Sequence, residues 1–284
     1  MSHSTCLVIG NDPEKQLEPF AEQWESDTPP YFAEFEEADL TKLKEKFDAR
    51  PPEEQRRYPT FKSWCEDAYG YSLHDGNYGY WTNPNAKWDW YLLGGRWSGF
   101  FKMKNGTSGS LGEPGAFDNK APDGYADQIL KKDIDIEGMR MQAKGKAWST
   151  YEQYERATAG KPMAQTWEEV RKQASDVDGA RDFYNNQPWI KALKKADLLP
   201  WMDDAHELFC VGTGGKEQFI QQAIDRTLST FAILNEGKWY EKGEMGWWGM
   251  SSDEMPESEW LKKSAEMFDA LPDDTLLSVY DLHI

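Results

Sequence analysis

The sequence predicts an α+β protein, because three patterns recur along its 284 residues. Short apolar runs bounded by turn residues, such as residues 6–9 and 230–234, are typical of buried strands. Apolar residues spaced three and four apart, as in residues 256–271, indicate amphipathic helices. Short connections with Gly and Asn, as at residues 235–237, favour hairpins because these residues tolerate positive φ angles.

Residues 206–284 predict a ferredoxin-like part with the order β-α-β-β-α-β. Its strands are predicted at residues 208–212, 230–234, 238–242 and 276–283, and its helices around residue 220 and at residues 256–271. The turn at residues 235–237 joins the two middle strands. The second helix ends at Pro272-Asp273-Asp274, and the last strand follows.

Residues 1–121 predict a related α+β half. Its elements are predicted as a strand at residues 6–9, a helix at residues 37–49, and strands at residues 87–93 and 96–103. Gly94 and Gly95 separate the last two strands, which is typical of a tight two-residue hairpin. The likeness of the two ends suggests a degenerate duplication. The alternative is one larger sheet assembled from both ends of the chain.

Between these two parts, residues 122–205 predict a helical insertion. Residues 105–123 are rich in Gly, Pro, Asn and Asp, which indicates a long loop. Aromatic residues then recur at helical spacing between residues 129 and 196. The sequence therefore predicts three parts, at residues 1–121, 122–205 and 206–284.

The three cysteines are an odd number without Cys-x-x-Cys spacing, and Cys6 and Cys210 lie in apolar runs. This pattern predicts reduced, buried thiols in a cytoplasmic protein. The start of the chain shows no signal-peptide pattern, and no apolar run approaches the roughly 20 residues that span a bilayer. We therefore expect a cytoplasmic protein that does not bind a membrane.

The net charge is −18, with 14 acidic and 5 basic residues in residues 11–54, and 17 acidic and 6 basic residues in residues 201–284. A field of this sign repels phosphate backbones and attracts basic protein surfaces, so direct nucleic-acid binding is not expected. The alternative is that the acidity serves solubility alone. The four histidines lack metal-ligand spacing, so neither a metal site nor a cofactor is expected.

Seven of the 14 tryptophans lie in two glycine-containing windows, at residues 81–97 and 239–248, which we expect to converge in the fold. The candidate ligand-binding or partner-binding residues of the first window are Trp88, Asp89, Arg96 and Trp97. An aspartate and an arginine beside several indole rings suit a planar, partly charged ligand. The alternative is a structural Arg–Asp pair packed by tryptophans.

The second window supplies the candidates Glu244, Trp247 and Trp248, and its glycines imply close backbone approach. Asp281 and His283 are two residues apart on the predicted last strand, so they face the same side and suit an acid–base pair. The alternatives are a solvated loop residue for Glu244 and a simple hydrogen bond at the end of the strand.

A glycine-rich turn before a helix forms a further candidate, an anion site. Its residues are Gly212, Gly214, Gly215 and Lys216. Backbone N–H groups at such a turn point toward an anion, and the lysine adds positive charge. The spacing is not that of a Walker loop, so no nucleotide triphosphate site is predicted here.

Three segments, KWDWY at residues 87–91, GGRW at residues 94–97 and GEMGWWGM at residues 243–250, resemble a family of uncharacterised proteins of bacteria and tailed phages. The likeness extends to residues 7–14 and 271–284, and so covers both ends of the chain. No activity is established for that family. The resemblance implies an accessory protein of a phage or a bacterium, and it assigns no catalytic residue.

These observations predict a non-catalytic acidic accessory protein, carried by a phage, that binds and modulates a host protein or defence complex with a basic surface. The alternative is an enzyme, or a binding protein for a small nucleotide-like ligand, with a Trp-lined pocket. The residues of that pocket would be Asp89, Arg96, Trp97, Glu244 and Trp247, with Asp281 and His283.

Overall fold

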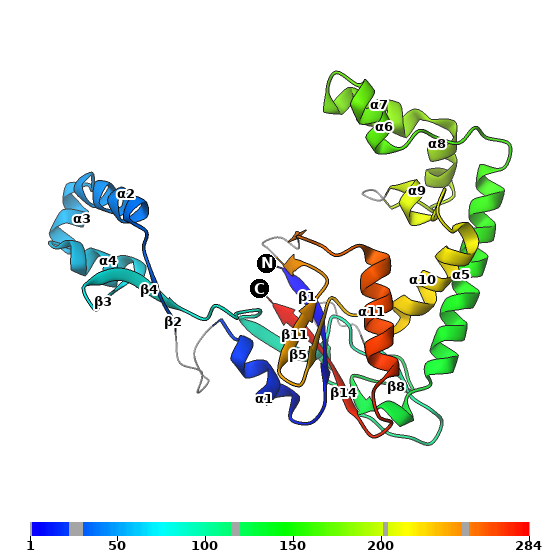
Figure 1. The fold of residues 1–284 in the computed structure, drawn as a ribbon, viewed down its shortest axis with the longest axis horizontal. Coiled ribbons are helices and arrows are strands. Elements are labelled where there is room, and N and C mark those ends of the chain that lie inside the picture. The colour runs from blue at the N-terminus through cyan, green and yellow to red at the C-terminus, as the bar shows by residue number, and fades with distance from the viewer. Residues whose placement is uncertain (1, 23–30, 115–119, 201–203, 246–249, 284) are drawn as a thin grey trace.

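The computed structural model describes residues 2–22, 31–114, 120–200, 204–245 and 250–283, and it confirms the mixed α+β class. Figure 1 shows a central sheet with a small helix-and-strand lobe projecting on one side and a helical arm on the other. No helix in the described ranges is long and apolar enough to cross a membrane.

The central sheet has seven strands among the described residues, in the order β11-β10-β1-β14-β5-β7, with β9 also paired to β14. The strands are β1 (His3–Ile9), β5 (Trp90–Gly95), β7 (Glu113–Pro114), β9 (Gln128–Leu130), β10 (Ala232–Asn235), β11 (Lys238–Glu241) and β14 (Leu276–His283). β1 is parallel to β10 and antiparallel to β14. Strands from both ends of the chain therefore share one sheet, the arrangement that the sequence left as the alternative to two related halves.

The remaining elements of this central part are the helix α11 (Glu257–Asp269) and several short ones. The short elements are α1 (Pro13–Leu17), η1 (Glu18–Phe20), β6 (Phe101–Lys102), β8 (Tyr125–Ala126), η2 (Lys131–Asp133), η3 (Arg226–Leu228), β12 (Glu244–Met245) and β13 (Ser251–Ser252). β6 pairs with β8, and β12 pairs with β13. The helix and the final strand predicted near the C-terminus are confirmed as α11 and β14.

The strand predicted at residues 208–212 is wrong. Residues Ala205–Leu208 form the short helix α9, and a turn follows in which Cys210 has a φ angle of 52°. Phe209 and Cys210 are buried against the helical arm, so the apolar run is explained by helix packing. A short apolar run does not distinguish a buried strand from a buried helical segment.

In the structure β10 instead pairs in parallel with β1, from the other end of the chain. β1 and β10 are direct neighbours, whereas a split β-α-β unit has another strand between its two parallel strands. The structure thus supports the α+β class without placing a ferredoxin-like unit in residues 206–284. The three predicted part boundaries stay a prediction.

The predicted hairpin at Gly94 and Gly95 is also wrong, because these residues end β5 and the next strand pairs with β8. Their φ angles are 72° and 52°. A Cβ atom at Gly95 would lie 2.5 Å from Oδ2 of Asp281, and one at Gly94 would collide with the carboxylate of Asp127. Two buried carboxylates therefore require these glycines, and a close approach leaves the same sequence signal as a turn.

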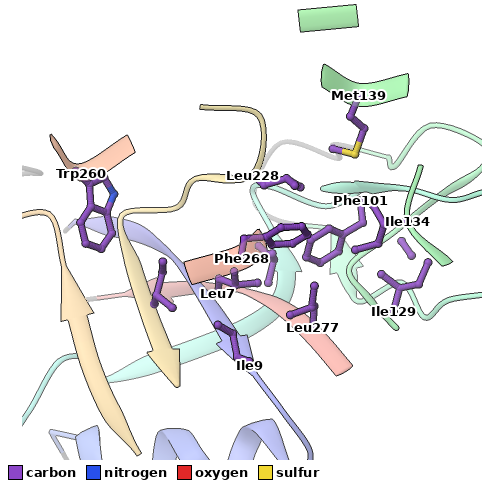
Figure 2. Packing of buried hydrophobic residues seen from close by; sticks show 13 residues of the cluster. Leu7, Ile9, Phe101, Ile129, Ile134, Met139, Leu228, Trp260, Phe268 and Leu277 are labelled. Atoms are coloured by element: carbon purple, nitrogen blue, oxygen red, sulfur yellow. The ribbon is translucent and has the colours of Figure 1, made fainter. Parts of the chain in front are cut away.

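Both faces of the central sheet are covered, because successive residues of a strand point to opposite faces. Leu7 and Ile9 pack under Trp260 and Phe268 of α11 (Figure 2). Cys6 and Val8 pack on the other face with α1. We call these the α11-side core and the α1-side core. All three cysteines are unpaired and buried.

The small lobe comprises residues 31–82 and contains a three-stranded sheet in the order β2-β4-β3. Its elements are β2 (Tyr31–Glu34), α2 (Glu37–Asp48), α3 (Pro52–Arg57), α4 (Phe61–Tyr69), β3 (Ser72–His74) and β4 (Asn77–Thr82). The helix predicted at residues 37–49 is confirmed as α2. Asn83 directly follows the lobe, at a position that we call its stem. The side-chain amide of Asn83 closes the stem by donating to the carbonyl oxygens of Pro19 and Ala21 at 2.8 and 2.9 Å.

The helical arm surrounds a separate aromatic core that includes Tyr154, Trp189 and Phe209. Its helices are α5 (Ile136–Thr158), α6 (Trp167–Gln173), α7 (Val177–Asn186), α8 (Pro188–Lys195), α9 (Ala205–Leu208) and α10 (Gly215–Asp225). The predicted helical character is confirmed from residue 136 onward, whereas residues 128–130 still belong to the sheet as β9.

Candidate functional site

β1 begins and β14 ends at the same end of the central sheet (Figure 1). Three aromatic rings lie together at this end. His3 of β1 lies opposite His283 of β14, and His283 lies opposite Trp90 of β5. Residues opposite each other on neighbouring strands share a face, so the three rings meet on one side of the sheet. The centroids of the two imidazole rings are 4.9 Å apart. The Trp90 ring is 6.2 Å from His3 and 6.3 Å from His283.

Each of the two histidines contacts a carboxylate through Nδ1. Nδ1 of His3 lies 2.7 Å from Oδ1 of Asp281, and Nδ1 of His283 lies 2.6 Å from Oδ1 of Asp89. An ionised carboxylate only accepts hydrogen bonds, so each Nδ1 carries its proton and donates it. In a neutral ring Nε2 is then the acceptor, which is the tautomer that a general base needs. We call these four residues the His–Asp cluster.

Asp281 is held on both of its oxygens. Its side chain is 1 % exposed, and Oδ2 accepts a hydrogen bond from the backbone N–H of Arg96 at 2.9 Å. Oδ1 contacts His3, and Gly95 packs directly against the side chain. A buried carboxylate is tolerated only when such partners compensate its lost hydration. Asp281 therefore fixes the orientation of the His3 ring.

A second buried carboxylate, Asp127, supports the turn that follows β5. Its Oδ2 accepts hydrogen bonds from the hydroxyl of Ser98 and the backbone N–H of Gly112, each at 2.9 Å. Its Oδ1 accepts from the backbone N–H of Gly99. The segment that carries Arg96 is therefore anchored by a buried carboxylate on either side.

The His–Asp cluster remains accessible from solvent. The side chains of His3 and His283 are 13 % and 15 % exposed, so only part of each ring meets water. Trp90 beside them is 46 % exposed and presents its indole at the sheet surface. Two oriented imidazoles next to an open aromatic ring can exchange protons with a bound molecule and contact its apolar part.

The structure brings together three of the predicted site residues, Asp89, Asp281 and His283. Asp281 and His283 share a face as predicted, but each pairs with a residue from elsewhere in the sequence. Arg96 is exposed and touches the cluster through its backbone N–H. Sequence reasoning missed His3 and Trp90 as members, and only the pairing of β1 with β14 brings His3 to the site.

Trp88 and Trp97 point away from the cluster into opposite cores. Trp88 packs in the α1-side core and donates from Nε1 to the carbonyl oxygen of Leu17 at 3.1 Å. Trp97 packs against the α11-side core. Their role as ligand-binding or partner-binding residues stays a prediction.

The two tryptophan windows contribute to the same core, because Trp88 and Trp239 both pack against the α1-side core. Beside them, Nζ of Lys87 lies 2.6 Å from Oε1 of Glu241. Glu244 is exposed and lines a cavity of about 210 Å³ with Ser4, Lys87, Trp239 and Glu241, among others. Trp247 and Trp248 lie outside the described residues.

The predicted anion site lies in the turn between α9 and α10. Gly212 and Gly214 precede the helix, and the backbone N–H of Gly215 donates to the carbonyl oxygen of Cys210 at 3.0 Å. Nζ of Lys216 lies 3.9 Å from the centroid of the Trp148 ring and 3.6 Å from Oε2 of Glu155. The N–H of Gly215 and the ammonium of Lys216 already have partners, and the anion site stays a prediction.

Among the described residues, no group of three or more His, Cys, Asp and Glu side chains is arranged to hold a metal ion. Comparison of the chain with protein-family models, with curated proteins and with solved structures gave no match.

Proposed function

We propose that the chain binds a small nucleotide-like phosphate ester at the His–Asp cluster and cleaves it by general acid–base chemistry. The observation that carries this proposal is the pair of imidazoles, each oriented by a carboxylate on Nδ1 and separated by 4.9 Å between ring centroids. Hydrolysis of an ester needs one group that accepts a proton and a second group that donates one.

In this reaction one imidazole accepts a proton through Nε2 from the attacking water as the oxygen–phosphorus bond forms. The other imidazole is doubly protonated. It gives one proton to the oxygen of the leaving group as the bond between that oxygen and phosphorus breaks. Asp89 and Asp281 stabilise whichever ring is positively charged. Trp90 packs against the base of the ligand.

The test uses bis(p-nitrophenyl) phosphate as substrate and adenosine monophosphate as ligand. His3→Asn and His283→Asn should each lower the hydrolysis rate by at least about 100-fold, the usual share of a general acid or base. His206→Asn is the matched control, because that imidazole packs on Trp189 in the helical arm.

Adenosine monophosphate should also shift the ring proton resonances of His3 and His283. Equal hydrolysis rates in folded wild-type and variant proteins would refute the acid–base role. A wild-type protein that neither hydrolyses the ester nor shows these shifts would refute the site itself.

A second function is favoured by a separate observation, an uncovered aromatic sheet face beside acidic side chains on the small lobe. It supports the sequence-based hypothesis of a phage-borne accessory protein that binds a host protein with a basic surface in the bacterial cytoplasm. The charge of −18 adds to the attraction of such a partner and opposes direct binding of nucleic acid. Association driven in this way should weaken as salt is raised.

A further inference from the structure

Three aromatic side chains from three strands of the small lobe form one cluster. The ring centroids of Phe32 on β2 and Trp81 on β4 are 5.1 Å apart. The His74 ring on β3 lies 5.1 Å from Phe32 and 5.0 Å from Trp81. We call these residues the aromatic triad.

A glycine at the centre of the sheet lets these rings meet. Gly79 lies between the outer strands, and a Cβ atom there would come within 2.8 Å of Cζ of Phe32. The Phe32 ring, with the backbone carbonyl oxygen of Ala33, therefore occupies the space that a side chain at this position would fill. This is a packing reason for a glycine inside a strand, where glycine otherwise weakens pairing.

The aromatic triad lies on the face of the sheet that the helices leave open. Tyr78 alternates with Gly79 along β4, so it points to the opposite face, where its ring lies 4.9 Å from Phe61 of α4. Trp81 is 41 % exposed, and His74 is exposed as well. Three contacting rings thus remain at the surface of the small lobe. Figure 1 shows that this lobe projects from the central sheet.

The surroundings of the triad are acidic. Glu34 is two residues from Phe32 on β2, so it shares the open face, and it is exposed. Asp75 follows His74 in the turn to β4, with Oδ2 3.5 Å from Nε2 of the imidazole. Residues 31–34 and 72–82, which form this sheet, contain no lysine or arginine.

We propose that the aromatic triad is the docking point for a basic segment of a protein partner, with a lysine or arginine side chain over the rings. A cation over an aromatic face is attracted by the negative charge density of that face. Glu34 and Asp75 supply carboxylates to the same cation, and the absence of basic side chains from the sheet removes competition for it. The proposal rests on the partner-binding function and locates it on the small lobe.

The experiment uses the full chain with ¹⁵N-labelled tryptophan indoles and the peptide acetyl-Gly-Arg-Gly-Arg-Gly-amide as the probe. Titration should shift the indole resonance of Trp81, which the spectrum of Trp81→Leu identifies. Trp81→Leu keeps an apolar side chain and removes the aromatic face, so affinity should fall about five-fold, the factor that corresponds to about 1 kcal/mol. Trp148→Leu is the matched control, because Trp148 is a comparably exposed indole on the helical arm.

Glu34→Gln provides a second variant that leaves the rings in place, and it should also weaken the peptide. Circular dichroism confirms that each variant is folded. Binding that shifts other indoles and is equal in wild type, Trp81→Leu and Glu34→Gln overturns the triad as the docking point, although a partner could still bind elsewhere. No binding of the peptide at low ionic strength overturns both the triad and the partner-binding function.

Discussion

Replacing Gly95 by alanine should destabilise the protein far more than the same change at Gly106. Both glycines have positive φ angles, 52° at Gly95 and 80° at Gly106, so alanine costs about 1–2 kcal/mol at either position. At Gly106 a Cβ atom meets nothing within 4 Å. At Gly95 it would lie 2.5 Å from Oδ2 of the buried Asp281, so that carboxylate has to move.

Movement of Asp281 breaks its hydrogen bond from the backbone N–H of Arg96, which is 2.9 Å long, and disturbs its contact with His3. A hydrogen bond to a charged group contributes about 1.5–3 kcal/mol. The total for Gly95→Ala is therefore about 2.5–5 kcal/mol, against about 1–2 kcal/mol for Gly106→Ala.

Urea unfolding followed by tryptophan fluorescence measures both values, from the midpoint and the slope of each transition. Proton spectra of His3 in Gly95→Ala should also change, because its carboxylate partner is displaced. Equal losses of stability in the two variants would show that the clash with Asp281 is relieved at no cost, and would refute this account of Gly95.

Three further changes test the packing. Burial raises the pKa of the Cys6 thiol far above its usual value, so this residue should resist alkylation at pH 8 in the folded protein and react only in urea. Trp260→Phe should lower the free energy of unfolding by about 2–4 kcal/mol, because it leaves a cavity and removes the 2.8 Å hydrogen bond to the buried Thr230 carbonyl. The hydrogen bond from Lys102 lowers the pKa of Asp135, so the ionised form stabilises the fold above the usual carboxyl range near pH 4, and this contribution is lost as the pH falls through the lowered value. Asp135→Asn should therefore lower the melting temperature at pH 7, and this effect should shrink as the pH falls through the lowered pKa of Asp135.

Local patterns predicted several individual helices and strands, whatever the partners with which they pair or pack. The helices at residues 37–49 and 256–271 and the strands at residues 6–9 and 276–283 follow from apolar spacing alone. The run at residues 208–212 failed because burial against other helices gives the same apolar pattern as burial in a sheet. Local sequence therefore predicted the α+β fold class better than it predicted the order of the strands in the sheet.

The neighbours of β10 show why the order of the strands in the sheet could not be predicted from local sequence. β1 pairs with β10 across a connection that contains both the small lobe and the helical arm. From composition alone, the apolar runs at residues 6–9 and 208–212 are equally good candidates to pair with β10. In the structure β1 is buried on both of its faces, because its side chains pack in the α1-side core and in the α11-side core. This burial favours a place for β1 inside the sheet, next to β10.

The His–Asp cluster illustrates the same limit at the level of chemistry. The strand period of two placed Asp281 and His283 on one face, and that inference needs no partner. Their partners, His3 and Asp89, lie 278 and 194 residues away in the sequence. The register of β1 against β14 makes the two imidazoles neighbours, and the pairing of β5 with β14 brings Asp89 beside them. The sequence therefore predicted two of the four residues of the His–Asp cluster as a pair.

One chain segment connects this cluster to the small lobe. β4, which carries Trp81, is followed by Asn83, and the side chain of Asn83 closes the stem of the lobe through two backbone carbonyls. Six residues later the backbone N–H of Asp89 donates to the carbonyl oxygen of His283 at 3.0 Å. The segment is thus fixed by hydrogen bonds at both of its ends, which restricts the motion of the lobe relative to the cluster. Because the same residues position the lobe and the carboxylate on His283, a variant that loosens the stem at Asn83 should disturb both sites together, whereas Trp81→Leu should leave the ring resonances of His283 unchanged.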